Sequence, residues 1–177
     1  VQAGIRRVVY ELGRNTKKYE VEALLPPSVP RSSYLAVSTT RSWRDISKTY
    51  SKIVDQRIKG AVDSALAQKA LGGKSVRQLG RSKTIQTLVR WVRKNVRYTG
   101  VEFGRAAIVP YRPGEVLRRK FGDCKDQSSL LVALLRQVGI SASVALLRAG
   151  TAEDTNASIP GAQQFNHAIV YIPGKKP

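Results

Sequence analysis

The strongest pattern in this sequence is an apolar helix that begins at the single cysteine of the chain. After Cys124, apolar residues recur at helical spacing and form one stripe. The stripe consists of Leu130, Leu131, Leu134, Leu135 and Val138. Gly139 is a natural C-terminal stop for such a helix. The pattern therefore predicts a buried helix whose first residue is the cysteine.

Weaker patterns predict three helices before this one and two strands after it. The helices are expected from Ser42 onward, over Ile58–Leu71 and over Ser82–Val96, with a short helical turn at Glu115–Arg119. The strands are expected over Ile140–Leu147 and Phe165–Ile172. Arg97–Phe103 is expected to be extended, whereas Ala106–Pro113 and Arg148–Gln164 are expected to be loops.

The first forty-one residues are different in character. Val8–Tyr10 and Tyr19–Leu25 resemble short strands, but Pro26, Pro27 and Pro30 favour an extended backbone after them. We predict that residues 1–41 are a linker or the edge of a preceding domain, and that residues 42–177 form the main domain. The alternative is that residues 1–41 form an ordered arm packed on that domain. The start at Val1 and the absence of methionine suggest a segment of a larger protein.

Composition excludes several classes of protein. A chain of 177 residues that is 42% hydrophobic is expected to form one globular domain with an appendage. Cys124 and His167 are the only residues of their types, so neither an internal disulfide nor a classical zinc site fits the chain. We predict no metal and no cofactor. No apolar run approaches the ~18 residues that a membrane span requires.

Cys124 and His167 lie where nucleophilic chemistry would place them. A thiol at a helix N-terminus meets unpaired backbone N–H groups and the positive end of the helix dipole, which favour the thiolate. His167 falls on the second predicted strand and would supply a base. Taken alone, a single cysteine is more often an inert buried thiol, and a single histidine is more often a core residue. The positions of the two residues favour a Cys–His pair.

The sequence around both residues resembles the bacterial transglutaminase-like domains. The segment 122–126 (GDCKD), followed by 130–136 (LLVALLR), is similar to their nucleophile helix. The segment 165–170 (FNHAIV) is similar to their histidine strand. Further similarity lies at 96–98 with Glu102, and at Pro110, Pro113 and 116–117. The segment 42–46 (SWRDI) resembles the start of the helical part in members that follow an N-terminal β-rich domain.

This resemblance implies an α+β, papain-like fold with helices packed on an antiparallel sheet and the cysteine at the start of the central helix. It also implies a Cys–His–Asp triad that forms a thioester with a glutamine side chain or a peptide carbonyl, which an amine or water then resolves. Cys124 would be the nucleophile and His167 the general base and acid. The expected substrate is a protein or a peptide. Because family members are often exported, an extracytoplasmic or periplasmic location is expected by analogy.

The third residue of the implied triad does not follow from this sequence. The family places it after the histidine strand, but no Asp or Glu follows His167. Asn166 is expected to point away from the ring, and Asp154 lies in a polar loop. We therefore expect the chain to end before the last strands of the domain. Loss of the orienting acid costs ~10⁴ in rate in serine proteases, so this segment is expected to be weakly active or inactive.

Three residues are expected to support the thiolate or the oxyanion. Gly122 would permit a tight entry into the helix, and Asp123 flanks the nucleophile, where helix capping is its expected role. The Cys124 amide would form half of an oxyanion hole. Tyr98 is the candidate for the second donor, with a place in the core as the alternative.

The charge of the chain suggests a second type of function. Lys and Arg number 31 against 12 Asp and Glu, for a net charge of +19. A basic face is predicted from Arg90, Arg93, Lys94, Arg97, Arg118, Arg119 and Lys120. It would suit an acidic polymer or another anionic partner, although few aromatic residues accompany it, which disfavours nucleic acid. A solvated surface balanced by other domains or by an acidic substrate is the simpler explanation. The alternatives to an enzyme are a non-catalytic papain-like binding module and a structural segment.

Overall fold

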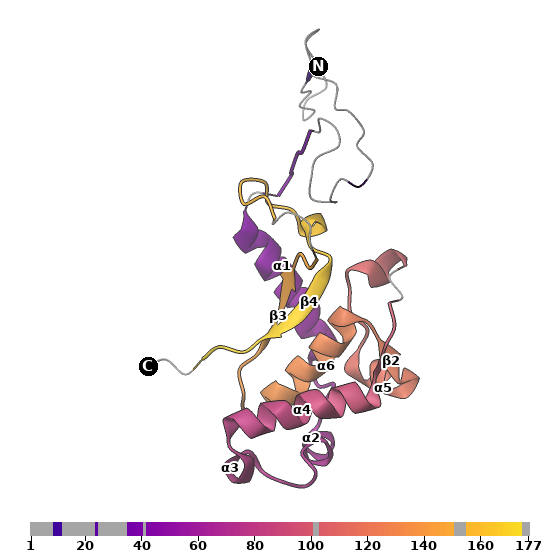
Figure 1. The fold of residues 1–177 in the computed structure, drawn as a ribbon, viewed down its shortest axis with the longest axis vertical. Coiled ribbons are helices and arrows are strands. Elements are labelled where there is room, and N and C mark those ends of the chain that lie inside the picture. Colours follow the sequence, from indigo (N-terminus) through magenta and orange to yellow (C-terminus); the bar gives the residue numbers. More distant parts are fainter. Residues whose placement is uncertain are drawn as a thin grey trace.

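The computed structural model describes residues 9–11, 24, 35–40, 42–100, 103–150 and 155–174. Its central element is α6 (Cys124–Gln137), which ends two residues before Gly139 and confirms the predicted central helix. Among the elements that pack on α6 are α1 (Trp43–Ile58), α4 (Arg81–Asn95), α5 (Pro113–Arg119), β3 (Ser143–Leu147) and β4 (His167–Tyr171) (Figure 1). The first residue of α6 therefore lies where several elements meet.

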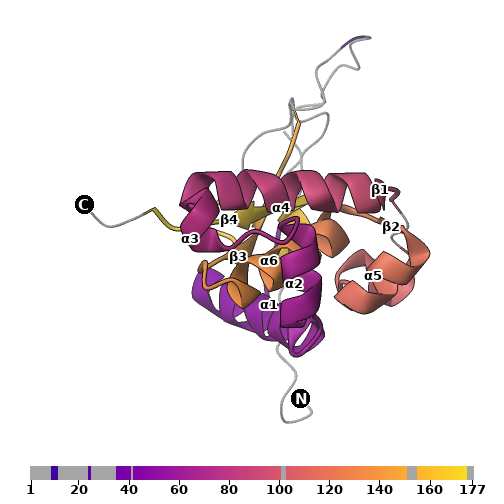
Figure 2. The ribbon, with the colours of Figure 1, turned by 90° about the horizontal axis from the view of Figure 1, so that it is seen from below.

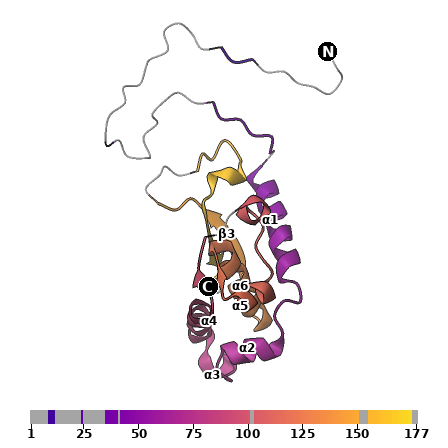
Figure 3. The same cartoon turned by 90° about the vertical axis from the view of Figure 1, so that its right-hand side faces the viewer.

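The hydrophobic core lies on both sides of α6. Leu88 of α4 and the α6 residues Leu130 and Leu134 have no exposed surface. Figures 2 and 3 show α6 between α4 on one side and α1 on the other. Each fully buried leucine contributes about 1.5–3 kcal/mol relative to an exposed one. This packing fixes the position and direction of α6, and with it the position of the cysteine.

The helices before α6 differ in part from the prediction. Ser42 caps α1 by accepting a hydrogen bond from the Asp45 amide, as expected. The single helix predicted over Ile58–Leu71 is wrong in its first part, because Ile58 is the last residue of α1 and α2 spans Ser64–Ala70. Between them Gly60 has a φ of 63°, and Asp63 caps a new helix. The short α3 (Val76–Leu79) was not predicted.

The strands form two separate pairs. β3 and β4 are antiparallel, with Leu147 opposite His167 and Ser143 opposite Tyr171, so both predicted strands are confirmed in a shorter form. β1 (Arg97–Tyr98) and β2 (Phe121–Gly122) are parallel. Of two short 3₁₀ helices, η2 (Ala162–Gln164) lies in a predicted loop, whereas η1 (Gly104–Ala107) begins two residues before the loop predicted over Ala106–Pro113.

The N-terminal predictions lie mostly outside the described residues. Of the two strands expected there, the structure describes residues 9, 10 and 24, and none of them is in a strand. The boundary between residues 41 and 42 stays a prediction. Residues 35–39 are exposed.

Candidate functional site

The cysteine is fixed by an elaborate cap at the start of α6. Asp123 is the N-cap residue, and its Oδ1 accepts hydrogen bonds from the amides of Lys125 (3.1 Å) and Asp126 (3.2 Å). In return, Asp126 Oδ2 accepts a bond from the Asp123 amide (3.4 Å), which completes a capping box. Cys124 is therefore the first helical residue, and its side chain is partly exposed. The expected capping role of Asp123 is confirmed.

Asp123 also holds a buried ammonium group. Lys125 is 4% exposed, and its Nζ forms an ion pair and hydrogen bond with Asp123 Oδ2. Asp123 itself is 1% exposed, and both of its oxygens are occupied by these contacts. Its support for the thiol is therefore indirect, through the geometry of the helix start and the placement of a cation beside it.

Gly122 is required by a close approach of side chains. A Cβ at this position would lie 2.8 Å from Asp126 Cβ and 3.2 Å from Val116 Cγ1. The φ of Gly122 is not in the left-handed region, so the tight entry expected here requires glycine because of packing and not because of backbone conformation. Asp126 Oδ1 in turn accepts a hydrogen bond from the Tyr111 amide (2.8 Å). Burial raises the pKa of the Asp126 carboxyl, and the negative Asp123 adds to this.

A hydrogen bond from the second turn of α6 holds the residue next to His167 against the helix. Ser128 lies four residues after Cys124 and therefore on the same face of the helix. Its Oγ donates to the carbonyl oxygen of Ala168 (3.2 Å), the residue after His167 in β4. This bond holds the start of β4 against the helix face that carries the thiol.

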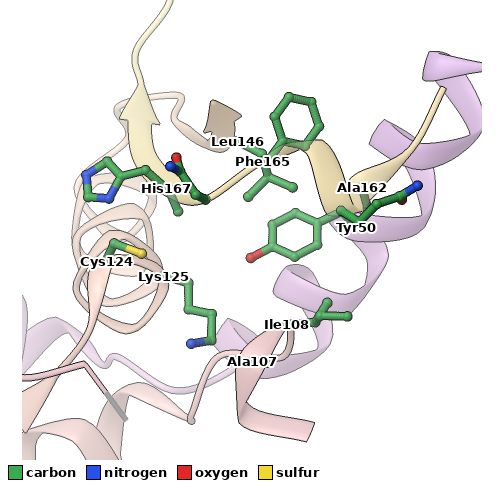
Figure 4. A pocket seen from close by; sticks show the side chains of 12 residues that line it. Tyr50, Ala107, Ile108, Cys124, Lys125, Leu146, Ala162, Phe165 and His167 are labelled. Atoms are coloured by element: carbon green, nitrogen blue, oxygen red, sulfur yellow. The ribbon is translucent and has the colours of Figure 1, made fainter. Parts of the chain in front are cut away.

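Cys124 and His167 line two cavities together. One of about 420 Å³ also contacts Tyr50, Ile108, Leu146 and Phe165, and Figure 4 shows it with the thiol, the imidazole and the Tyr50 ring around it. The other, of about 510 Å³, lies between α4, α6 and β4. No hydrogen bond joins the thiol to the imidazole within the described part of the chain. The thiol and the imidazole therefore border the same two cavities.

Tyr50 was not predicted as a site residue, because its spacing from Trp43 and Ile46 makes it one member of an apolar helix stripe. It is 8% exposed and contributes to the first cavity. Burial raises its pKa to about 12, and the negative charges of Cys124, Asp123 and Asp126 act in the same direction. A hydroxyl group within an otherwise apolar stripe was the signal that marked it.

Of the other predicted residues, Tyr98 and Arg93 line the second cavity. Tyr98 is 57% exposed, lies opposite Gly122 in the β1–β2 pair, and lines the second cavity with Cys124. Arg93 lines the same cavity. Arg90 and Lys94 on α4 and Arg97 at the start of β1 are exposed.

The three cations at the end of α5 are not equivalent. Arg118 and Lys120 are exposed. Arg119 forms an ion pair with Glu115 (3.4 Å) and stacks on the rings of Tyr111 (4.2 Å) and Phe121 (4.6 Å). These contacts anchor α5 to β2, so Arg119 has a structural role.

No described carboxylate forms a hydrogen bond or an ion pair with His167. Both amide atoms of Asn166 are bound to the backbone of Ala149, at 2.7 and 3.0 Å, and Asp154 lies outside the described residues. Among the residues that the structure describes, no group of three or more His, Cys, Asp or Glu is arranged to hold a metal ion. None of the described helices is both long and apolar enough to cross a membrane.

Comparisons with known proteins point to one family. No curated protein matches the sequence. One similar solved structure is the crystal structure of a "putative protease" from Parabacteroides distasonis ATCC 8503, with 18% identity and a TM-score of 0.54. The match covers 80% of this chain and 29% of that protein, and it shows that the two share a fold. The family model of the transglutaminase-like superfamily matches residues 64–174. Because this match spans more than half of the sequence, the chain belongs to the transglutaminase-like superfamily, and its α+β fold is the one expected for that family.

Proposed function

We propose that the protein is a cysteine acyltransferase or amide hydrolase that acts on proteins or peptides, with Cys124 as nucleophile and His167 as base. The observation that supports this most directly is the placement of both side chains on the same two cavities, at the head of a capped helix. The Ser128–Ala168 hydrogen bond supports it further, because it ties the histidine strand to the cysteine face of α6.

The proposed reaction has two steps. His167 takes the proton of the thiol, Cys124 Sγ bonds to the amide carbonyl carbon, and the C–N bond breaks as His167 gives the proton to the departing amine. The thioester is then attacked by water or by a second amine, which passes its proton to His167. The C–S bond breaks, and the proton returns to the sulfur.

Alkylation of Cys124 by iodoacetamide tests this proposal across pH 5.5–9. We expect the parent to react at pH 6 at least about tenfold faster than a free thiol, whose pKa of ~8.5 leaves little thiolate there. His167→Ala is expected to lose this advantage at pH 6 and to approach the parent rate at pH 9. Mass spectrometry measures the rate, with Cys124→Ala as the unlabelled control.

Two results would contradict the proposal. One is a parent thiol that reacts only as the pH rises past 8, as an ordinary cysteine does. The other is equal rates at pH 6 in the parent and in His167→Ala, since the ring would then not act on the thiol.

A second candidate function, a non-catalytic module that binds a polyanion, is favoured by the charge of α4. No acidic residue occurs between Asp63 and Glu102, whereas nine Lys and Arg do. Arg90, Arg93, Lys94 and Arg97 are exposed, and none forms an ion pair within the described part of the chain. Such a surface attracts anions over about 10 Å at 0.1 M salt and over a longer range at lower salt.

A further inference from the structure

The polar side chains that line the first cavity are almost all committed to other groups. Lys125 Nζ is paired with Asp123, and both amide atoms of Asn166 are bound to Ala149. Gln163 is exposed on η2. Apart from the thiol, the imidazole and the exposed Gln163 amide, the polar side-chain group that remains in the lining is the Tyr50 hydroxyl.

Tyr50 is held by the core and yet has an unused hydrogen-bond donor. It occupies the middle of α1, is 8% exposed, and belongs to the same buried cluster as Leu130 and Leu134 of α6. Among the described residues, nothing forms a hydrogen bond with its Oη. Figure 4 shows this oxygen directed toward the part of the cavity that holds Cys124 and Lys125. Ser129 Oγ is the fully enclosed side-chain oxygen without a partner among the described residues, whereas Tyr50 Oη is reached from the cavity and is free to donate a hydrogen bond to a bound ligand.

We infer that Tyr50 Oη donates a hydrogen bond to the carbonyl oxygen of the acyl substrate as negative charge develops on it. The inference rests on the proposed function, and it makes Tyr50 a catalytic residue. Tyr98 fits this role less well, because it is 57% exposed and lines the other cavity.

The chemistry of the cavity is consistent with this role. When Cys124 Sγ bonds to the carbonyl carbon, the π electrons of the C=O bond move to oxygen, and a donor placed there lowers the barrier. When the intermediate collapses, the electrons return and the amine leaves. The Cys124 amide, which takes part in no hydrogen bond of the described residues, would be a second donor. Because burial raises the pKa of Tyr50 to about 12, its hydroxyl keeps its proton at neutral pH.

Two reagents that attack the same sulfur by different routes test the inference. Acylation of Cys124 by p-nitrophenyl acetate passes through an oxyanion, whereas alkylation by iodoacetamide does not. Tyr50→Phe is expected to slow acylation on the order of 10- to 100-fold and to change alkylation less than twofold. The reaction of Cys124→Ala with p-nitrophenyl acetate is subtracted as background from other nucleophiles.

The controls separate this role from a structural one. Tyr171→Phe removes a hydroxyl from an exposed tyrosine of β4 that lines neither cavity, and both rates should stay at the parent values. The melting temperature of Tyr50→Phe should equal that of the parent, because the hydroxyl has no partner to lose and the ring still fills its place.

Two outcomes would overturn the inference. If Tyr50→Phe slows both reactions equally, the residue acts on the thiol or on the fold, and if it slows neither, it does not contact the oxyanion. A parent that alkylates no faster than a free thiol would instead count against the proposed function. Even then, the ratio of acylation to alkylation rates in the parent and in Tyr50→Phe still decides the role of Tyr50.

Discussion

At the scale of single residues, the entry to α6 depends on a glycine whose missing side chain makes room for its neighbours. Gly122→Ala places a Cβ 2.8 Å from Asp126 Cβ, in a capping box that cannot move without losing its hydrogen bonds. We expect a loss of about 1–3 kcal/mol in the free energy of unfolding, the range typical of overpacking. Urea denaturation measures it.

Gly114→Ala is the matched control for this substitution. Gly114 lies in the first turn of α5 with open space around it, so alanine is expected to leave the stability unchanged or raise it slightly. A Gly122→Ala protein as stable as the parent would show that the capping box is less rigid than its contacts indicate.

The sequence identifies some of the site residues better than others. The positions of Cys124, Asp123 and Gly122 could be predicted, because they depend on local sequence at a helix start with a recognisable cap. Tyr50 was not identified, because the direction of its hydroxyl depends on how α1 packs against α6, a contact between residues far apart in the chain. The sequence also did not predict that Arg119 is packed and Arg118 exposed, since this difference depends on the rings of Tyr111 and Phe121.

At the scale of elements, two adjacent serines of α6 allow the attachment of β4 to be tested separately from the stability of the helix. Ser128 Oγ binds the Ala168 carbonyl, whereas Ser129 Oγ is buried and has no partner among the described residues. Ser128→Ala is expected to lose about 1 kcal/mol of unfolding free energy and to slow alkylation of Cys124 at pH 6, because the histidine strand loosens. Ser129→Ala is expected to be neutral or stabilising, with an unchanged alkylation rate.

Chemical denaturation and iodoacetamide labelling of both variants measure these effects. If Ser128→Ala and Ser129→Ala behaved alike, the bond between α6 and β4 would not be what positions the histidine. The two substitutions remove the same atom from neighbouring positions of one helix, so helix propensity cancels in the comparison.

The elements themselves were predictable where one pattern dominates. The stripes of α4 and α6 are long, and both helices were located within two residues. The break between α1 and α2 was missed because apolar residues continue through Ile58 at helical spacing, and the turn depends on Gly60 and the Asp63 cap. The parallel pairing of β1 with β2 joins two-residue segments more than twenty positions apart, which no local pattern specifies.

At the scale of the whole molecule, the positive charge is concentrated in one part of the chain. The chain also matches only part of a longer protein of similar fold. The chain spans 29% of that protein, so the activity of a longer protein would depend on more than the residues described. The net charge of +19 therefore has two explanations, which are a solvated surface balanced elsewhere and a surface that binds an anion. Only the second explanation requires the cations to lie at particular positions.

Binding of labelled poly-glutamate distinguishes these explanations. One variant replaces Arg90, Arg93, Lys94 and Arg97 with glutamine, and its matched control replaces the exposed cations Arg44, Lys48, Lys52 and Lys59 of the α1 region. Both lower the net charge from +19 to +15, since four cations are removed from each. If the α4 face is the binding surface, the first variant loses affinity. The slope of its log affinity against log salt concentration also becomes shallower, by an amount that corresponds to the loss of up to about four charge contacts. The control keeps most of its affinity and most of its salt dependence. Equal weakening of the two variants would show that net charge alone attracts the polymer, and the basic face would then be a solvated surface.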